Sequence, residues 1–197
     1  MKSSIPTGLS VLRARRNAAD LLPADGFKPL TNRRKHKSYT TALELNCSRD
    51  EVFDAINNVR EWWSEEVEGR TDQPGARFTI HFNNIHRSAH KITEWVPGKR
   101  VVWHVPDARI NFVKDQGEWN GTDIIFEISR KGGWTKLRFT HSGLVPEFEC
   151  YDGCSEAWGF YINESLQRLI MTGQGEPSRK EARRIGSRII IGAAASL

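Results

Sequence analysis

The chain has 197 residues, 38% of them hydrophobic, which suits one soluble domain with a hydrophobic core and terminal extensions. Its net charge of +5 comes from its ends, because residues 1–38 carry +7, residues 178–197 carry +4 and the segment between them carries −6. An acidic domain should repel a phosphate backbone, so we predict no specific nucleic-acid partner.

Residues 1–38 are predicted to form a flexible, basic N-terminal extension that is separable from the domain. They contain three prolines and the basic run Arg33–Lys37, which is typical of a solvated segment. A specific nucleic-acid or partner site in this run is the alternative. The scattered charges and the lack of a continuous apolar run argue against a secretory signal, while a transit peptide stays open.

Residues 178–197 are predicted to form a basic and apolar C-terminal tail, which either binds a partner or has no function. The run Ile185–Leu197 is too short to cross a bilayer and is interrupted by Arg188, so no membrane span is predicted. The three cysteines lack the spacing of zinc ligands and predict free thiols in a cytoplasmic protein. A redox-sensitive pair at Cys150 and Cys154 is the alternative.

The domain is predicted to span residues 39–177 and to begin with a strand over Tyr39–Asn46, whose apolar side chains alternate. Ser48 and Glu51 have the spacing of a capping box, which predicts a helix over Arg49–Asn57. A second short helix is expected over residues 60–64.

A series of antiparallel strands is predicted next. Pro97-Gly98-Lys99 and Lys131-Gly132-Gly133 are hairpin signals. The predicted strands cover residues 76–83, 86–96, 100–105, 108–113, 122–129 and 134–141.

One long amphipathic helix is predicted after the last strand. Trp158, Ile162, Leu166 and Leu169 are spaced four, four and three residues apart, which places them on one side of a helix. Two glycines and a proline at positions 173, 175 and 177 predict its end. Strands followed by one long helix indicate an α+β domain.

These features together resemble a known family. The sequence Thr140-His-Ser-Gly-Leu144, the Ala157-Trp158 pair early in the helix and the Thr172-Gly-x-Gly-x-Pro177 motif after it resemble the START-like (SRPBCC) superfamily. Within it, the chain is most similar to proteins related to the C-terminal domain of the activator of heat-shock-protein-90 ATPase. The resemblance implies a helix-grip (START or Bet v 1-like) fold, in which a curved antiparallel sheet wraps a long C-terminal helix. It also implies a cavity between them for apolar or amphipathic small molecules.

Aromatic side chains are the main candidates for such a cavity, because all seven tryptophans lie between Trp62 and Trp158. Ordinary core packing is the alternative explanation for the same rings. The predicted pocket residues are Trp62, Phe78, Phe82, Trp95, Trp103, Phe112, Trp119, Phe139, His141, Trp158, Tyr161 and Ile162.

His141 is the predicted main polar group of the pocket, because it alternates with Leu137 and Phe139 toward the helix. A buried histidine paired by the protein itself is the alternative. We expect Glu127 to face solvent and leave Glu94 ambiguous. Four other histidines are expected on solvent faces: His81, His86, His90 and His104. A metal site formed by His81, His86 or His90 would lack acidic or cysteine partners, so we do not predict one.

The prediction of function depends on which catalytic motifs the sequence has and which it lacks. The sequence has no nucleophile elbow, zinc-protease motif or phosphate-binding loop, so we predict no catalytic residue, cofactor or metal. The leading hypothesis is a cytoplasmic protein that binds a hydrophobic or amphipathic small molecule. One alternative is an enzyme of the polyketide cyclase or aromatase type, assisted by His141. The other is a chaperone-interacting module, although residues 1–38 have no room for the activator's separate N-terminal domain.

Overall fold

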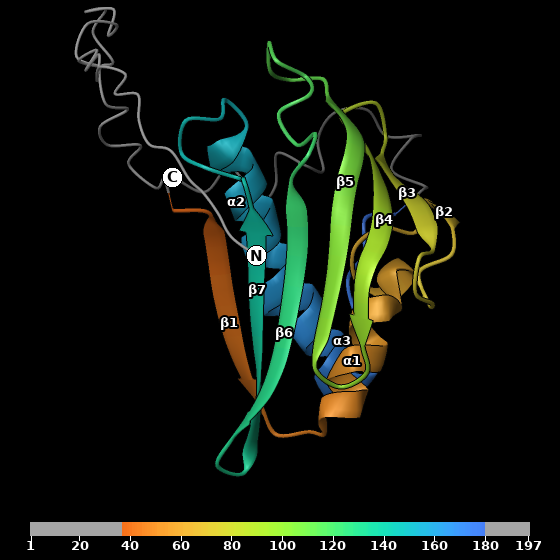
Figure 1. Ribbon diagram of the computed structural model, residues 1–197, viewed down its shortest axis with the longest axis vertical. Coiled ribbons are helices and arrows are strands. Elements are labelled where there is room, and N and C mark those ends of the chain that lie inside the picture. The colour runs from red at the N-terminus through yellow and green to blue at the C-terminus, as the bar shows by residue number, and fades with distance from the viewer. Residues whose placement is uncertain (1–36, 180–197) are drawn as a thin grey trace, which may run out of the picture. The chain divides into compact units, whose positions relative to one another are not determined.

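The computed structural model describes residues 37–179, which form a curved sheet with a long C-terminal helix packed along it (Figure 1). The strands are β1 (Tyr39–Leu45), β2 (Val67–Gly69), β3 (Arg77–Phe82), β4 (His86–Val96), β5 (Arg100–Ile110), β6 (Asp123–Lys131) and β7 (Trp134–Ser142). The helical segments are α1 (Arg49–Asn57), η1 (Val59–Glu61), α2 (Tyr151–Phe160), η2 (Tyr161–Leu166) and α3 (Gln167–Thr172). Predictions about residues 1–36 and 180–197 lie outside this described part.

The strands form a seven-stranded antiparallel sheet in the order β1-β7-β6-β5-β4-β3-β2. Strands β2 to β7 follow one another as a meander, and β1 returns to the far edge beside β7, where Tyr39 pairs with His141. The predicted α+β helix-grip fold is therefore confirmed. Within residues 37–179, no helix is long and apolar enough to cross a membrane.

The predicted strands 100–105 and 108–113 are one continuous strand, β5, which ends at Ile110. Strand β6 pairs only with residues 100–104 of β5, whereas β4 pairs with nearly its whole length. Pro106 lies where the register between β4 and β5 shifts, at a bulge opposite His90, and a bulge is one of the positions in a sheet where proline is tolerated. The short β2 was not predicted, and the C-terminal helix begins at Tyr151.

The first helix begins as the sequence predicts. The Ser48 hydroxyl accepts a hydrogen bond from the Glu51 N–H at 3.1 Å, and the Glu51 carboxylate accepts one from the Ser48 N–H at 2.7 Å. This capping box pairs two amide groups that the first turn of α1 would leave open. Val52, Phe53 and Ile56 form the buried side of this helix.

The C-terminal helix runs without interruption through α2, η2 and α3, and its middle part, η2, is π-helical. The four residues predicted to line one side, Trp158, Ile162, Leu166 and Leu169, are all buried, as expected. A π-helical turn shifts the residues that follow it around the helix axis. Ser165, in η2, is also buried.

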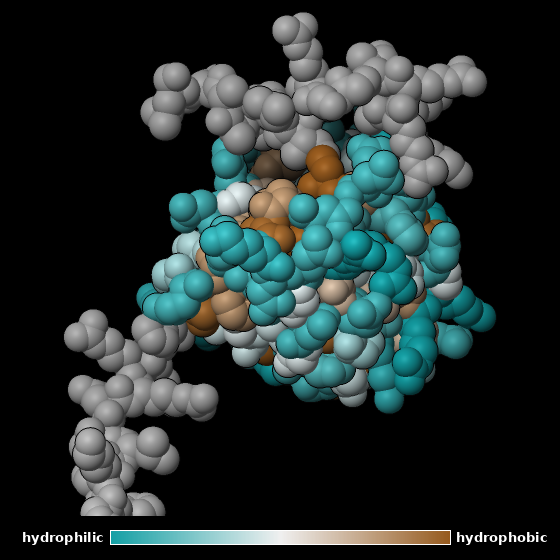
Figure 2. All heavy atoms as spheres, turned by 90° about the horizontal axis from the view of Figure 1, so that it is seen from above, coloured by the Kyte–Doolittle hydropathy of each residue, from teal (hydrophilic) through white to brown (hydrophobic). Residues whose placement is uncertain are grey.

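The loop between β5 and β6 lies at the upper end of the sheet in Figure 1, and its Glu118 side chain accepts a hydrogen bond from the Cys150 N–H at the start of α2. Figure 2, seen from this end, shows apolar side chains exposed between hydrophilic ones. Phe112, in the loop after β5, is 55% exposed.

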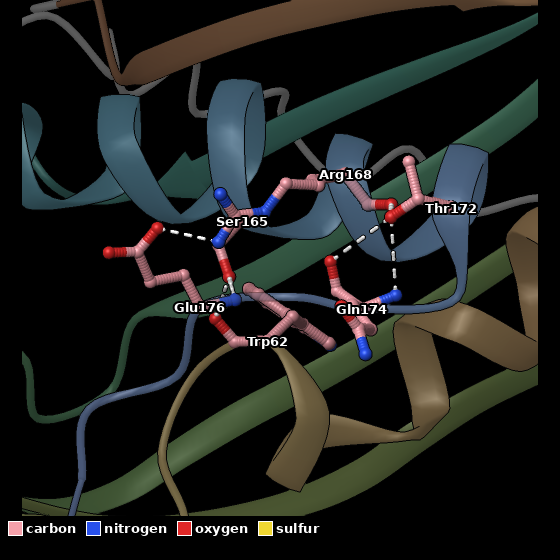
Figure 3. Close-up of polar contacts among 6 residues, drawn as sticks. All are labelled: Trp62, Ser165, Arg168, Thr172, Gln174 and Glu176. Atoms are coloured by element: carbon pink, nitrogen blue, oxygen red, sulfur yellow. Dashed lines mark hydrogen bonds and ion pairs between the residues drawn. The ribbon is translucent and has the colours of Figure 1, made fainter.

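Residues 173–178 form a strap that returns from the helix to the segment after η1 (Figure 3). Gly173 ends the helix with φ at 79°, a left-handed conformation that glycine adopts without strain. The Ser165 hydroxyl donates to the Trp62 carbonyl at 2.7 Å and accepts from the Glu176 N–H at 2.7 Å. The Ser178 N–H donates to the Trp63 carbonyl at 3.0 Å.

Position 175 of the strap requires glycine because the backbone of a neighbouring segment lies close to it, and not because of its own backbone conformation. A Cβ atom at this position would lie 2.1 Å from the Glu61 carbonyl oxygen. We expect Gly175→Ala to lower the free energy of unfolding by about 1–3 kcal/mol, because the strap must move away from the backbone that it covers. Urea denaturation measures this change.

Gly153→Ala is the matched control, because Gly153 is an exposed residue of α2 and a Cβ there meets nothing within 4 Å. This change should leave stability unaltered or raise it by up to about 1 kcal/mol, since alanine favours the helix. Equal effects of the two substitutions would show that the strap does not pack as described.

Candidate functional site

Aromatic rings fill the space between the sheet and the C-terminal helix by direct contact. Trp62 stacks on Trp63 with ring centroids 5.9 Å apart, and Trp63 contacts Trp158 at 4.8 Å. Trp158 in turn stacks on Trp119 at 5.9 Å with the ring planes 13° apart. These four rings, which we call the tryptophan row, cross the core from the strap to the loop after β5. Trp103 stacks on the first two of them.

Most of the predicted pocket residues meet in this interior. Tyr161 is partly buried and contacts Phe82 at 5.8 Å. Trp95 packs instead on Phe53 of α1 at 4.9 Å. Phe112 was expected in the interior but is exposed, because β5 ends before it. The buried members of the predicted set are Trp62, Phe78, Phe82, Trp103, Trp119, Phe139, His141, Trp158 and Ile162.

His141 has a protein partner on each ring nitrogen. Its Nδ1 accepts a hydrogen bond from the Trp158 indole N–H at 3.0 Å, so Nδ1 carries no proton. The proton therefore sits on Nε2, which donates to the Thr122 hydroxyl at 2.9 Å. That hydroxyl donates to the Trp119 carbonyl at 2.6 Å. Burial lowers the pKa of His141 to about 3, so this chain of hydrogen bonds holds a neutral imidazole.

A second group of polar side chains lies on the inner face of β4. His86, Ser88 and His90 alternate along the strand and share their face with the buried Ile92. We call these three residues the β4 polar stripe. The expectation that His86 and His90 face solvent is wrong: His90 is 1% exposed, and both pair in register with buried phenylalanines of β3. Their polar chemistry suggested the outer face, whereas their position along the strand places them inside.

The β4 polar stripe is only partly paired. Ser88 Oγ lies 2.8 Å from His90 Nε2. Within residues 37–179, His86 Nε2, His90 Nδ1 and the Trp103 indole N–H are buried and have no hydrogen-bond partner. Such groups are rare in folded proteins, and each costs about 1–3 kcal/mol. Burial lowers the pKa of His86 to about 4, and burial followed by the other two histidines lowers that of His90, so both rings are neutral near pH 7.

Three aromatic residues surround the stripe where it approaches the surface. His86 is partly exposed, and its ring contacts Phe82 at 5.6 Å and Trp119 at 4.4 Å. Phe82 also contacts Tyr161 of η2. Burial raises the pKa of Tyr161 to about 12, against the effect of a hydrogen bond with Ser178, so its hydroxyl is protonated. We call His86, Phe82, Trp119 and Tyr161 the portal.

The loop after β5 is held over the portal by two carboxylates. Glu118 accepts from the Glu149 N–H at 2.6 Å and from the Cys150 N–H at 2.9 Å, which caps the start of α2. Glu149 accepts from the Lys114 N–H at 2.8 Å. These contacts fix Trp119 against Trp158.

The Trp119 N–H faces the Cys150 thiol, a weak acceptor, although their geometry falls short of a hydrogen bond. A hydrogen bond to Cys154, followed by burial, raises the pKa of the Cys150 thiol, so it is not a reactive thiolate. Cys47, Cys150 and Cys154 are free thiols.

Glu94 and Glu127 lie on the outer side of the sheet, where both pair with Arg100 at 2.7–2.8 Å. The structure thus agrees with the expectation for Glu127 and resolves the ambiguity of Glu94. A shallow groove of about 320 Å³ lies elsewhere, between α1 and α3. Its lining residues are Glu51, Asp54, Ala55, Asn58, Leu169 and Ile170.

The neutral state of His141 makes stability depend on pH. Its pKa rises from about 3 in the folded chain toward the ordinary 6.5 on unfolding, so the unfolded state gains a proton as pH falls. The contribution of the neutral His141 to the free energy of unfolding is complete above pH 6.5. It decreases by roughly 1.4 kcal/mol per pH unit between pH 6.5 and pH 3. His141→Phe should therefore be most destabilising near pH 7.5, by about 1–3 kcal/mol for each partner left unpaired. The deficit relative to the unmodified chain should shrink at pH 5.

Urea denaturation of both proteins at the two pH values measures this difference. His86 and His90 are present in both chains, and burial, the main cause of their lowered pKa values, is common to both; the coupling of His90 to His141 is the smallest of the causes that act on His90. A deficit that is equal at pH 7.5 and pH 5 would contradict the neutral, internally paired His141.

Comparison with known proteins places this geometry in a family. The family model described as activator of Hsp90 ATPase homolog 1-like protein matches residues 46–171. A sequence search of curated proteins gave no match.

Solved structures with the same fold are similar at low sequence identity. The Aha1 dimer from Colwellia psychrerythraea is 22% identical over 71% of this chain and 99% of its own, with a TM-score of 0.57. DynU16, a putative protein in the dynemicin biosynthetic locus, is 15% identical over 69% of this chain and 48% of its own, with a TM-score of 0.53. Mll3558 from Rhizobium loti is 20% identical over 65% and 93%, with a TM-score of 0.51.

At these identities the likeness to solved structures shows a shared fold. The family model covers the first helix, the sheet from β2 to β7 and nearly all of the C-terminal helix. The chain belongs to the family of activator of Hsp90 ATPase homolog 1-like proteins.

Proposed function

We propose that the chain binds a hydrophobic or amphipathic small molecule at the β4 polar stripe, between the sheet and the C-terminal helix. The observation that carries this proposal is the set of unpartnered ring nitrogens on His86, His90 and Trp103 inside an aromatic core. Apolar residues at the stripe would avoid the cost of burying these groups. A ligand with a polar atom among its apolar ones would supply the missing partners while burying its own surface.

Short side chains beside the stripe support the same position. Ser88 pairs in register with Ala108 of β5, and both are buried. The inner face of the sheet therefore presents two of its smallest side chains next to its unpartnered nitrogens. The portal gives the route from solvent, because two of its rings, those of His86 and Tyr161, are only partly buried. Rings in contact must separate for a ligand to enter, and Tyr161 belongs to the π-helical segment, a feature often found at functional sites.

A binding role is better supported than a cyclase reaction. Acid–base catalysis needs a titratable pair within reach of the substrate. His104 and Asp123 form such a pair at 2.9 Å, but they lie half-exposed on the outer face of the sheet, away from the rings. His141 is occupied on both nitrogens by the protein.

The proposal predicts that a larger side chain in the stripe prevents binding. N-phenyl-1-naphthylamine, an uncharged probe whose emission rises on leaving water, should bind the unmodified chain. Ser88→Leu should weaken this binding at least about tenfold, because leucine would take the place that a ligand needs beside the unpartnered nitrogens. Ala89→Leu is the matched control: Ala89 alternates with Ser88, so its side chain lies on the other face, and binding should be unchanged.

A second pair of variants guards against misfolding of Ser88→Leu. His86→Trp enlarges a partly exposed portal ring and should slow or weaken binding of the probe, whereas His104→Trp on the outer face should not. Probe titrations and circular dichroism of all four variants complete the test. Failure of the unmodified chain to bind, or equal binding by both members of each pair, would overturn the proposal.

A further inference from the structure

We infer that the ligand of the β4 polar stripe is an uncharged, flat molecule with a carbonyl-type oxygen, and that this oxygen accepts the hydrogen bond of the Trp103 N–H. This inference rests on the proposed function and narrows its ligand to a chemical class.

The need for an acceptor follows from Trp103. An indole N–H can only donate, and that of Trp103 is buried without a partner in a side chain that is 0% exposed. Aromatic rings surround it, with Phe126 at 4.7 Å and Phe78 at 5.2 Å between ring centroids. A ligand oxygen would therefore gain a hydrogen bond that no neighbouring protein group supplies.

His90 allows the ligand some variety beside this fixed donor. Its ring lies 6.2 Å from that of Trp103, and its Nδ1 has no partner. If the Ser88 hydroxyl donates to His90 Nε2, Nδ1 carries the proton and donates; if the hydroxyl accepts, Nδ1 is free to accept. The stripe can therefore match a second carbonyl or a hydroxyl, whereas the contact with Trp103 requires an acceptor.

The absence of charge follows from the surroundings of the stripe. The charged residues of β4 that alternate with it, Arg87 and Lys91, are exposed on the outer face, where Arg87 pairs with Asp107. The histidines are neutral because they are buried. A carboxylate or ammonium group placed beside the stripe would lose its hydration without gaining an opposite charge, which disfavours a charged ligand strongly.

The flat shape follows from the rings on both sides. Phe78 stacks on His90 at 4.8 Å, and Trp63 approaches His90 from its edge at 5.4 Å. A ligand that enters here replaces contacts between rings. A planar ring system keeps stacked and edge-to-face contacts of the same kind, whereas a bulky saturated one does not.

Three probes of nearly the same shape test the class: 9-fluorenone, which has a carbonyl; fluorene, which lacks it; and 9-fluorenone-4-carboxylate, which is charged. Quenching of intrinsic tryptophan fluorescence measures each affinity. Fluorenone should bind about fivefold tighter than fluorene, as one added neutral hydrogen bond implies. It should bind at least about tenfold tighter than the carboxylate, which must be desolvated. If none of the three probes binds although N-phenyl-1-naphthylamine does, the ligand class fails; if N-phenyl-1-naphthylamine does not bind either, the proposed function fails. If fluorene or the carboxylate binds as tightly as fluorenone, the ligand class fails while binding at the stripe stands.

The role of the Trp103 N–H as the donor is tested by the ratio of the affinities for the two uncharged probes, fluorenone and fluorene. Trp103→Phe should bring the fluorenone-to-fluorene ratio close to one, whatever its effect on either affinity alone. Trp95→Phe, which packs on α1, should keep the ratio. If Trp103→Phe does not fold, nuclear magnetic resonance of the unmodified chain decides: the Trp103 indole proton should move downfield with fluorenone and not with fluorene. An unchanged ratio or an unmoved proton would overturn the assignment of Trp103.

Discussion

Trp158 joins the C-terminal helix to the sheet, and the arrangement of the interior depends on it. Its ring lies between Trp63 and Trp119 in the tryptophan row and also contacts Phe139 of β7 at 4.7 Å. Its N–H donates to His141 on the same strand. One side chain thus provides apolar contact, stacking and a directed hydrogen bond between two layers, and this combination sets both the height and the rotation of the helix over the sheet.

The same interior contains two histidine systems with opposite consequences. His141 on β7 has a partner on both nitrogens, so its protonation state and ring orientation are set by the protein. His86 and His90 on β4 are as neutral as His141 but each keeps one buried nitrogen without a partner. A paired buried histidine contributes to one defined structure, whereas an incompletely paired one lowers stability unless something else completes it. This contrast is the reason why we propose β4 rather than β7 as the site of ligand binding.

The two ends of the helix are held by different means. Glu118 and Glu149 link the first turn of α2 to the loop after β5 through backbone N–H groups, which suits carboxylates at a helix N-terminus. At the other end, Ser165 connects η2 to Trp62 and to the strap. The π-helical segment that contains Ser165 also contains Tyr161, so the residue that holds the strap and the residue at the portal share one segment. If a ligand enters by the portal, as proposed, it would displace a residue close to the anchor of the strap.

Local spacing in the sequence determined the order of the elements, the capping box at Ser48, the hairpin turns and the buried side of the last helix, because these depend on residues a few positions apart. It also placed His141 inside, since alternation with Phe139 requires it. Only the tertiary structure decided which buried polar groups have partners. His86 and His90 alternate along the strand like residues of an inner face, but their side chains are polar, which is typical of an outer face. Only the pairing of β4 with β3 decided that they lie inside. The tautomer of His141 depends on Trp158, seventeen positions away, and the role of Gly175 on its contact with Glu61. Contacts between residues distant in the chain form only when the whole sheet closes on the helix, and no local pattern encodes them.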